Sequence, residues 1–165
     1  MKRTAFALSL LTALVVAIPT AAVASTPEER KWAVDTTRWL EENPLSPEAK
    51  ARTAELLKWW ISVPDLTLSA CPLLLDVKNK KIGPTVATQA MLSTGAFVIE
   101  HPSGSRAEQV MAGVEGALRA YGNAVKIDEK TRDRFLDELV AAKAAGKLKE
   151  AYVDNAVKHC EETTK

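Results

Sequence analysis

Few residues of this chain have types and spacings that could carry chemistry. Two histidines occur, His101 directly after Glu100 and His159 directly before Cys160. The chain has no Gly-x-Ser-x-Gly, Ser-x-x-Lys or His-Glu-x-x-His motif and no glycine-rich phosphate loop. A contact of His101 with the dipole of a preceding helix is enough to explain its position. The sequence therefore predicts a non-enzymatic protein without a metal or cofactor. The alternative is a hydrolase or metal-dependent enzyme that uses Glu100, His101 or His159.

Adjacent carboxylates are a further possible source of acid–base chemistry. Among the adjacent pairs are Glu41-Glu42, Asp137-Glu138 and Glu161-Glu162. Each pair lies in a charged stretch, which predicts exposure to solvent. Because a catalytic carboxylate needs a fixed position and a perturbed pKa, none of the six is a candidate catalytic residue.

The two cysteines, Cys71 and Cys160, are predicted to form a disulfide. The chain has no Cys-x-x-Cys motif, and neither cysteine lies at metal-ligand spacing from a histidine. His159 adjoins Cys160, but adjacent side chains on a helix point about 100° apart. In an oxidising compartment, two cysteines in a small domain are typical of a structural bridge. Such a bridge would join the middle of the chain to its last helix.

Tryptophan gives the stronger of two signs of a binding surface. All four, Trp32, Trp39, Trp59 and Trp60, lie within the first 36 residues after Ala24. Aromatic residues at helical spacing usually fill a core, which is one explanation for Trp32, Trp39 and Trp60. Trp59 projects at the edge of an apolar face and is predicted to be partly exposed. The candidate binding residues are therefore Trp39, Trp59 and Trp60.

The second sign is an uncharged polar edge on the segment 84–100. It consists of Thr85, Gln89 and Ser93. Buried polar groups need hydrogen-bond partners. Neighbouring helices or the backbone could supply these partners, and the alternative is a small ligand pocket.

Residues 1–24 have the pattern of a Sec-type secretory signal. Two basic residues precede an apolar run over 5–18, and Ala22-Val23-Ala24 offers the small residues that a signal peptidase needs. The apolar run is too short for a stable transmembrane helix. We expect cleavage between Ala24 and Ser25 and a periplasmic location, with release into the medium as the alternative.

Charge and hydropathy limit the partners of residues 25–165. The full chain has 22 basic and 21 acidic residues, and removal of Lys2 and Arg3 leaves a net charge of −1. This balance predicts no binding to nucleic acid or anionic lipid. The uncharged stretch from Ile82 to Ile99 contains several threonines and serines, so no membrane span is expected in the mature chain.

Helical periodicity predicts an all-α domain. The expected helices are, in order, 27–42, 47–63, a short one within 65–77, 84–100, 106–126, 129–145 and 148–160. Their predicted caps include Thr26, Ser46, Ser69, Ser105 and Asp128. Pro44, Pro64 and Gly146 are the expected stops.

Two of these helices are predicted to form the centre of the fold. The segment 84–100 carries no charge before its last residue, and the helix after it has one face of small residues, Gly113, Gly116, Ala117, Ala120 and Ala124. Glycine inside a helix costs about 1 kcal/mol relative to alanine. We therefore expect a neighbouring helix to pack closely against this face.

These patterns together predict a single-domain bundle of six or seven helices, stapled by one disulfide and preceded by a cleavable signal. Its predicted function is that of a secreted or periplasmic protein that binds a protein, a peptide or an apolar small molecule. Besides the enzyme considered above, a structural envelope component is the second alternative.

Overall fold

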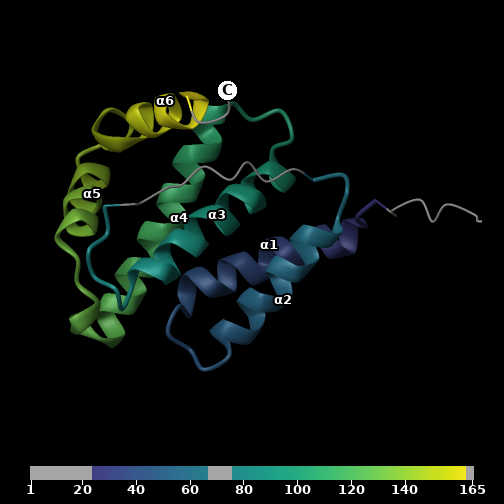
Figure 1. Ribbon diagram of the computed structural model, residues 1–165, viewed down its shortest axis with the longest axis horizontal. Helices are drawn as coiled ribbons and strands as arrows, with labels where there is room; N and C mark the ends of the chain where they lie inside the picture. The colour runs from purple at the N-terminus through teal and green to yellow at the C-terminus, as the bar shows by residue number, and fades with distance from the viewer. Residues whose placement is uncertain (1–23, 67–75, 163–165) are drawn as a thin grey trace, which may run out of the picture.

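The computed structural model describes residues 24–66 and 76–162, and every regular element in these ranges is helical (Figure 1). A 3-10 turn, Glu129–Thr131, and a π-helical segment, Lys149–Val153, accompany six α-helices. The α-helices are α1 (Pro27–Glu42), α2 (Ala49–Ser62), α3 (Gly83–Glu100), α4 (Arg106–Ile127), α5 (Arg134–Ala144) and α6 (Asp154–Glu162). The all-α prediction is confirmed. Within these ranges no helix combines the length and apolar character that a membrane crossing requires.

Local start signals place α1 and α4 where the sequence predicts them, whereas α3 begins at Gly83, one residue early, without a side-chain cap. Thr26 accepts the backbone N–H of Glu29, and the Glu29 carboxylate accepts the N–H of Thr26. Ser105 and Glu108 form the same capping box at the start of α4. Ser69, the cap of the short helix expected within 65–77, lies outside the described residues.

The predicted start of α2 is wrong by two residues. The Ser46 hydroxyl accepts the N–H of Glu48, and the N–H of Ala49 donates to the Ser46 carbonyl, so a turn precedes the helix. Helical spacing puts Ile61 on the same apolar face as Leu56 and Trp60 and so predicts its burial, which is also wrong, because its side chain is 87% exposed. Among the described helices, α2 packs its backbone on α1 alone, and it buries only a narrow stripe around Leu56 and Trp60.

The predicted cap of α5 is wrong as well. Asp128 accepts the N–H of Lys130 and caps only the 3-10 turn. Asp133 caps α5, because its carboxylate accepts the N–H groups of Phe135 and Leu136. Helical spacing puts Val140 on the same face as Leu136 and Leu139 and so predicts its burial, but Val140 is 41% exposed. The segment 148–160, predicted as one helix, begins as a π-helical segment and continues as α6.

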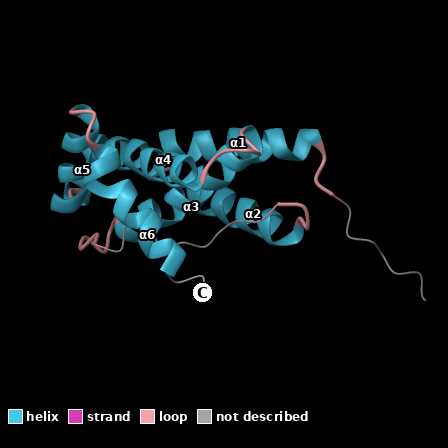
Figure 2. Cartoon of the chain, turned by 90° about the horizontal axis from the view of Figure 1, so that it is seen from above, coloured by secondary structure: helices cyan, strands magenta, loops and turns pink. Residues whose placement is uncertain are grey.

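α3 and α4 lie side by side at the centre, as predicted (Figures 1 and 2). The small face of α4 is buried along its length. One apolar cluster joins these two helices to α5 and the C-terminal segment, and a second joins α1 and α2 to Leu92 of α3. Where α1 meets α3 and α4, polar side chains are buried as well, and they include Thr37, Glu41, Gln89 and Ser93.

The disulfide prediction concerns one described residue and one that is not described. Cys160 is 2% exposed, and it is not a free thiol. Its predicted partner, Cys71, lies outside the described residues. No bridge therefore joins two residues of the described ranges, and the Cys71–Cys160 pairing stays a prediction.

Candidate functional site

Glu41, in the last turn of α1, is the most deeply buried carboxylate among the described residues. Only 4% of its side chain is exposed, so the assignment of Glu41 to an exposed stretch is wrong, whereas Glu42 is exposed as predicted. Glu41 shares one helical face with the buried residues Ala33, Thr37 and Leu40. This spacing is the sequence signal that could have identified its burial.

Two arginines hold the Glu41 carboxylate. Arg119 of α4 donates from Nε to Oε2 at 2.7 Å and from Nη2 to Oε1 at 3.1 Å. Arg38 donates to Oε1 at 3.0 Å, and the Ser93 hydroxyl donates to the same oxygen at 2.7 Å. Burial raises the pKa of Glu41, but the hydrogen bonds from Arg119 and Ser93 and the charges of both arginines outweigh it. The pKa therefore lies below its ordinary value, and the carboxylate is ionised at neutral pH.

This network fixes the orientation of the Gln89 amide. An ionised carboxylate only accepts hydrogen bonds, so the single hydroxyl hydrogen of Ser93 is directed to Glu41. Gln89 Nε2 then donates to Ser93 Oγ at 3.0 Å and to the Thr37 carbonyl at 3.3 Å. Its oxygen, Oε1, is left as an acceptor that receives no hydrogen bond from any residue in 24–66 or 76–162.

Gln89 lines a groove of about 450 Å³ between α2 and the first half of α3, which we name the α2–α3 groove. Its polar lining on α3 also includes Thr85 and Thr88, whose hydroxyls make no hydrogen bond within the described ranges. Of the residues in 24–66 and 76–162, Lys50 is the one charged residue that lines the groove. The remaining walls are largely apolar and include Leu40, Pro44, Leu45, Ala54, Leu57 and Leu92.

The predicted polar edge is thus divided between two environments. Thr85 and Gln89 both line the α2–α3 groove. Ser93 is fully buried and does not reach the groove, because it lies between Gln89 and Glu41. Internal hydrogen bonds satisfy Ser93, whereas Gln89 is satisfied only on its nitrogen.

The candidate tryptophans lie apart from this groove. Trp59 meets Trp32 and Trp60 edge to face, with ring centroids 5.9 and 5.1 Å apart. The Arg52 guanidinium lies 4.2 Å over the ring of Trp39. Trp39 and Trp59 are half-buried, and Trp60 is 6% exposed. All four pack within the second apolar cluster, and none lines the α2–α3 groove.

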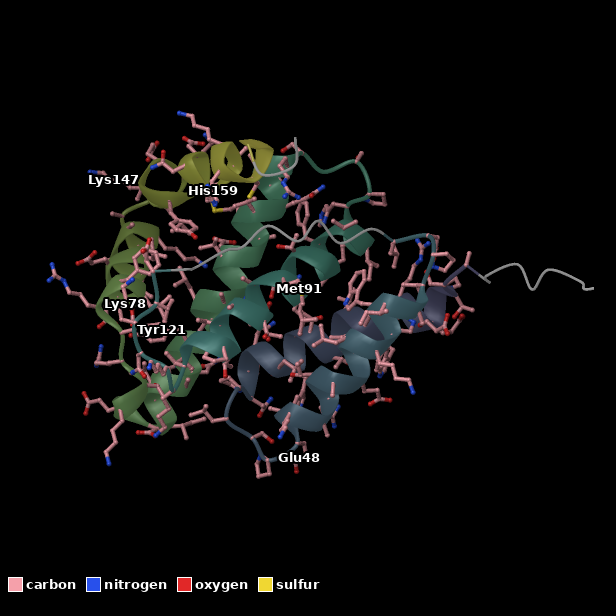
Figure 3. All side chains as sticks on the ribbon, viewed as in Figure 1. Glu48, Lys78, Met91, Tyr121, Lys147 and His159 are labelled. Atoms are coloured by element: carbon pink, nitrogen blue, oxygen red, sulfur yellow. The ribbon has the colours of Figure 1, made fainter. Side chains whose placement is uncertain are left out.

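The structure does not bring the two histidines into one site. His101 is exposed at the end of α3 and stacks on Phe97 at 4.5 Å, while Glu100 accepts a hydrogen bond from Arg38. His159 lies on α6 (Figure 3). Within the described ranges, no group of three or more His, Cys, Asp or Glu side chains could hold a metal ion.

A second buried polar cluster lies on the other side of α4, around Tyr121 (Figure 3). Its hydroxyl donates to Asp137 at 2.8 Å and accepts the N–H of Asp133 at 2.9 Å. Burial and the Asp137 carboxylate raise the pKa of Tyr121 to about 12, so the hydroxyl keeps its proton. The Asp133 carboxylate also accepts the N–H groups of Lys78 and Asn79, both at 2.8 Å. This cluster therefore fastens the segment before α3 to the start of α5.

Glu41, Arg38 and Arg119 are site residues that no sequence motif marks, although they fix the orientation of the Gln89 amide through Ser93. The local sequence shows them only as charges at the surface of two helices. No family model, curated protein or solved structure matches this chain.

Proposed function

We propose that this protein is a secreted, non-enzymatic binding protein whose site is the α2–α3 groove. Its ligand is a small, largely apolar molecule that carries a hydrogen-bond donor, such as a hydroxyl or an amide N–H. Gln89 Oε1 is the observation that supports this proposal, because it is the unpartnered acceptor of a side chain only 4% exposed. Oε1 is not one of the fully buried unpartnered atoms of the described residues, which are Trp59 Nε1 and Trp60 Nε1, so it stays open to a donor of the ligand.

The size and charge of the groove favour this class of ligand. A volume of about 450 Å³ is typical of small-molecule sites. The apolar walls would bury the body of the ligand, and Lys50 alone offers a charge to it. The hydroxyls of Thr85 and Thr88 offer further hydrogen bonds to its polar end.

A pair of probes that differ by one donor tests this assignment. Naphthol presents a hydroxyl donor, and its methyl ether has nearly the same apolar body without one. We expect naphthol to bind about two- to tenfold more tightly, which is the range for one net hydrogen bond. Isothermal titration of the full chain measures both affinities, and Gln89→Met, which removes the acceptor at similar volume, should abolish the preference.

Two phenylalanine variants, one that fills the groove and one that lies outside it, test the location of the site. Ala54 lines the groove on α2, whereas Ala51 lies one turn earlier on the same helix, is exposed and does not line it. Ala54→Phe should weaken naphthol binding, and Ala51→Phe should leave it unchanged. Equal affinities of naphthol and its ether, or equal effects of the two phenylalanine variants, would rule the groove out as the site.

Export and removal of residues 1–24 belong to the same proposal. The backbone N–H of Ser25 donates to Asp65 at 3.0 Å, and the Ser25 hydroxyl and Arg30 donate to the same carboxylate. The backbone hydrogen bond of Ser25, followed by those of Arg30 and the Ser25 hydroxyl, lowers the pKa of Asp65 to about 2 despite desolvation. Cleavage after Ala24 would turn this N–H into an ammonium group beside an ionised carboxylate. In the oxidising compartment that export implies, the predicted Cys71–Cys160 bridge could form.

We expect the protein recovered from cells to begin at Ser25 and to unfold at a higher temperature than the same chain with Ala24 retained. The new ion pair with Asp65 is the physical reason. Intact-mass spectrometry and thermal unfolding measure the two quantities. Asp65→Asn should remove the difference in unfolding temperature, whereas Asp76→Asn, at an exposed carboxylate elsewhere, should preserve it. A recovered mass that includes residues 1–24 would contradict the proposal.

A further inference from the structure

We propose a second ligand site, separate from the α2–α3 groove, that binds the carboxylate of an organic molecule. It is a hollow of about 810 Å³ between the end of α1 and the second half of α4, which we name the α1–α4 hollow. The residues that carry the argument are Arg38, Glu42, Leu118, Arg119, Asn123 and Lys126.

Carboxylates hold both guanidinium groups of the hollow in place, but not every N–H group of these arginines has an acceptor in the described ranges. Arg119 directs Nε and Nη2 to Glu41, and its Nη1 donates to no residue in the described ranges. The Arg38 and Arg119 side chains stay 40% and 41% exposed, while the carboxylate between them is 4% exposed. The hollow therefore presents fixed donors with the planar geometry that suits a carboxylate.

Lys126 is the cation of the hollow that no carboxylate of the described ranges pairs with. Arg38 and Arg119 both bind the buried Glu41, and Arg38 also donates to Glu100 at 2.9 Å. Lys126 Nζ donates to the amide oxygen of Asn123 at 3.1 Å and has no carboxylate partner in the described ranges. One unpaired ammonium group matches the single charge of a carboxylate, whereas the exposed Glu42 would repel a phosphate dianion more strongly.

The shape of the hollow favours an organic molecule over a lone ion. A side-chain carbon added at Gly122 would meet no atom within 4 Å, so this part of the wall is open. Leu118 supplies apolar surface beside it. A volume of about 810 Å³ leaves room for a ring or a chain attached to the carboxylate.

Benzoate and inorganic phosphate are the probes that test this assignment. We expect benzoate, titrated into the full chain at low salt, to shift the backbone NMR signals of residues 118–126 in a saturable manner. Lys126→Gln should weaken benzoate binding about two- to fivefold, as the loss of one exposed charge predicts. Glu42→Gln should strengthen it by a similar factor, because the substitution removes a repelling charge.

Lys147→Gln is the matched control, since Lys147 is exposed at the α5–α6 turn, away from α1 (Figure 3). It should leave benzoate binding unchanged. All three variants alter exposed side chains, and unchanged thermal unfolding would show that the fold is intact. Equal effects of Lys126→Gln and Lys147→Gln, no shift at 118–126, or tighter binding of phosphate than of benzoate would each overturn the proposal. Naphthol binding in the groove should not respond to Lys126→Gln, so the two sites are tested independently.

Discussion

Gly116→Ala should lower the free energy of unfolding by about 3 kcal/mol, a large effect for the addition of one methyl group. A Cβ atom at this position would lie 2.0 Å from Ser93 Oγ and 2.6 Å from Glu41 Oε1. Neither neighbour can move freely, because Ser93 is fully buried and Glu41 is held by Arg38 and Arg119. The methyl group must therefore separate α3 from α4 or break the hydrogen bond between Ser93 and Glu41.

Gly122→Ala, in the same helix, is the control. A Cβ atom there meets nothing within 4 Å, so alanine brings only its higher helix propensity and should stabilise the protein by up to about 1 kcal/mol. Urea unfolding followed by circular dichroism measures both variants against the parent chain. A destabilisation by Gly122→Ala equal to that by Gly116→Ala would contradict the close packing at position 116.

The sequence predicts the centre of this fold because the relevant signals are local. The uncharged α3 and the small face of α4 are visible as composition and helical spacing, and the structure packs these two helices on each other. The capping boxes at Thr26 and Ser105 depend on residues three positions apart, so the starts of α1 and α4 are also readable.

Other features depend on contacts between segments that are distant in the sequence. Asp128 and Asp133 are equally good caps by residue type, and the structure selects Asp133 for α5. The Asp133 carboxylate also accepts the N–H groups of Lys78 and Asn79, which lie more than 50 residues earlier. No sequence pattern within one helix predicts these contacts, and so none predicts which aspartate caps α5.

The candidate site likewise combines features that are local in the sequence with features that depend on contacts between distant segments. Thr85 and Gln89 are recognisable as a polar edge, but the groove that they line depends on where the Ser46 turn places α2. Glu41 looks like one of two exposed acids, and its burial requires Arg119, which lies 78 residues later. The helical phase that Glu41 shares with Ala33 and Thr37 is the local sign of this burial.

Glu41→Gln should lower the free energy of unfolding at neutral pH by about 3 kcal/mol. The variant keeps the shape of the side chain but leaves two arginines around a neutral amide. An amide also cannot accept at both of its ends, so one of the contacts from Arg119 is lost. Glu42→Gln is the control, because this neighbouring side chain is exposed and its substitution should change the free energy by less than about 0.5 kcal/mol.

The pH dependence identifies the Glu41 charge as the cause. The folded pKa of this group lies below its ordinary value of 4.5, so its contribution to stability is complete above the unfolded pKa and declines as the pH falls through the folded pKa. Urea unfolding of the parent chain and of Glu41→Gln should therefore show a constant difference above about pH 5.5 and a shrinking one below about pH 4.5. Asp65 and Asp133 also have lowered pKa values, but they are present in both proteins and cancel in the difference. A difference that stays constant down to about pH 3 would mean that the shape of the Glu41 side chain, and not its charge, joins α1 to α4.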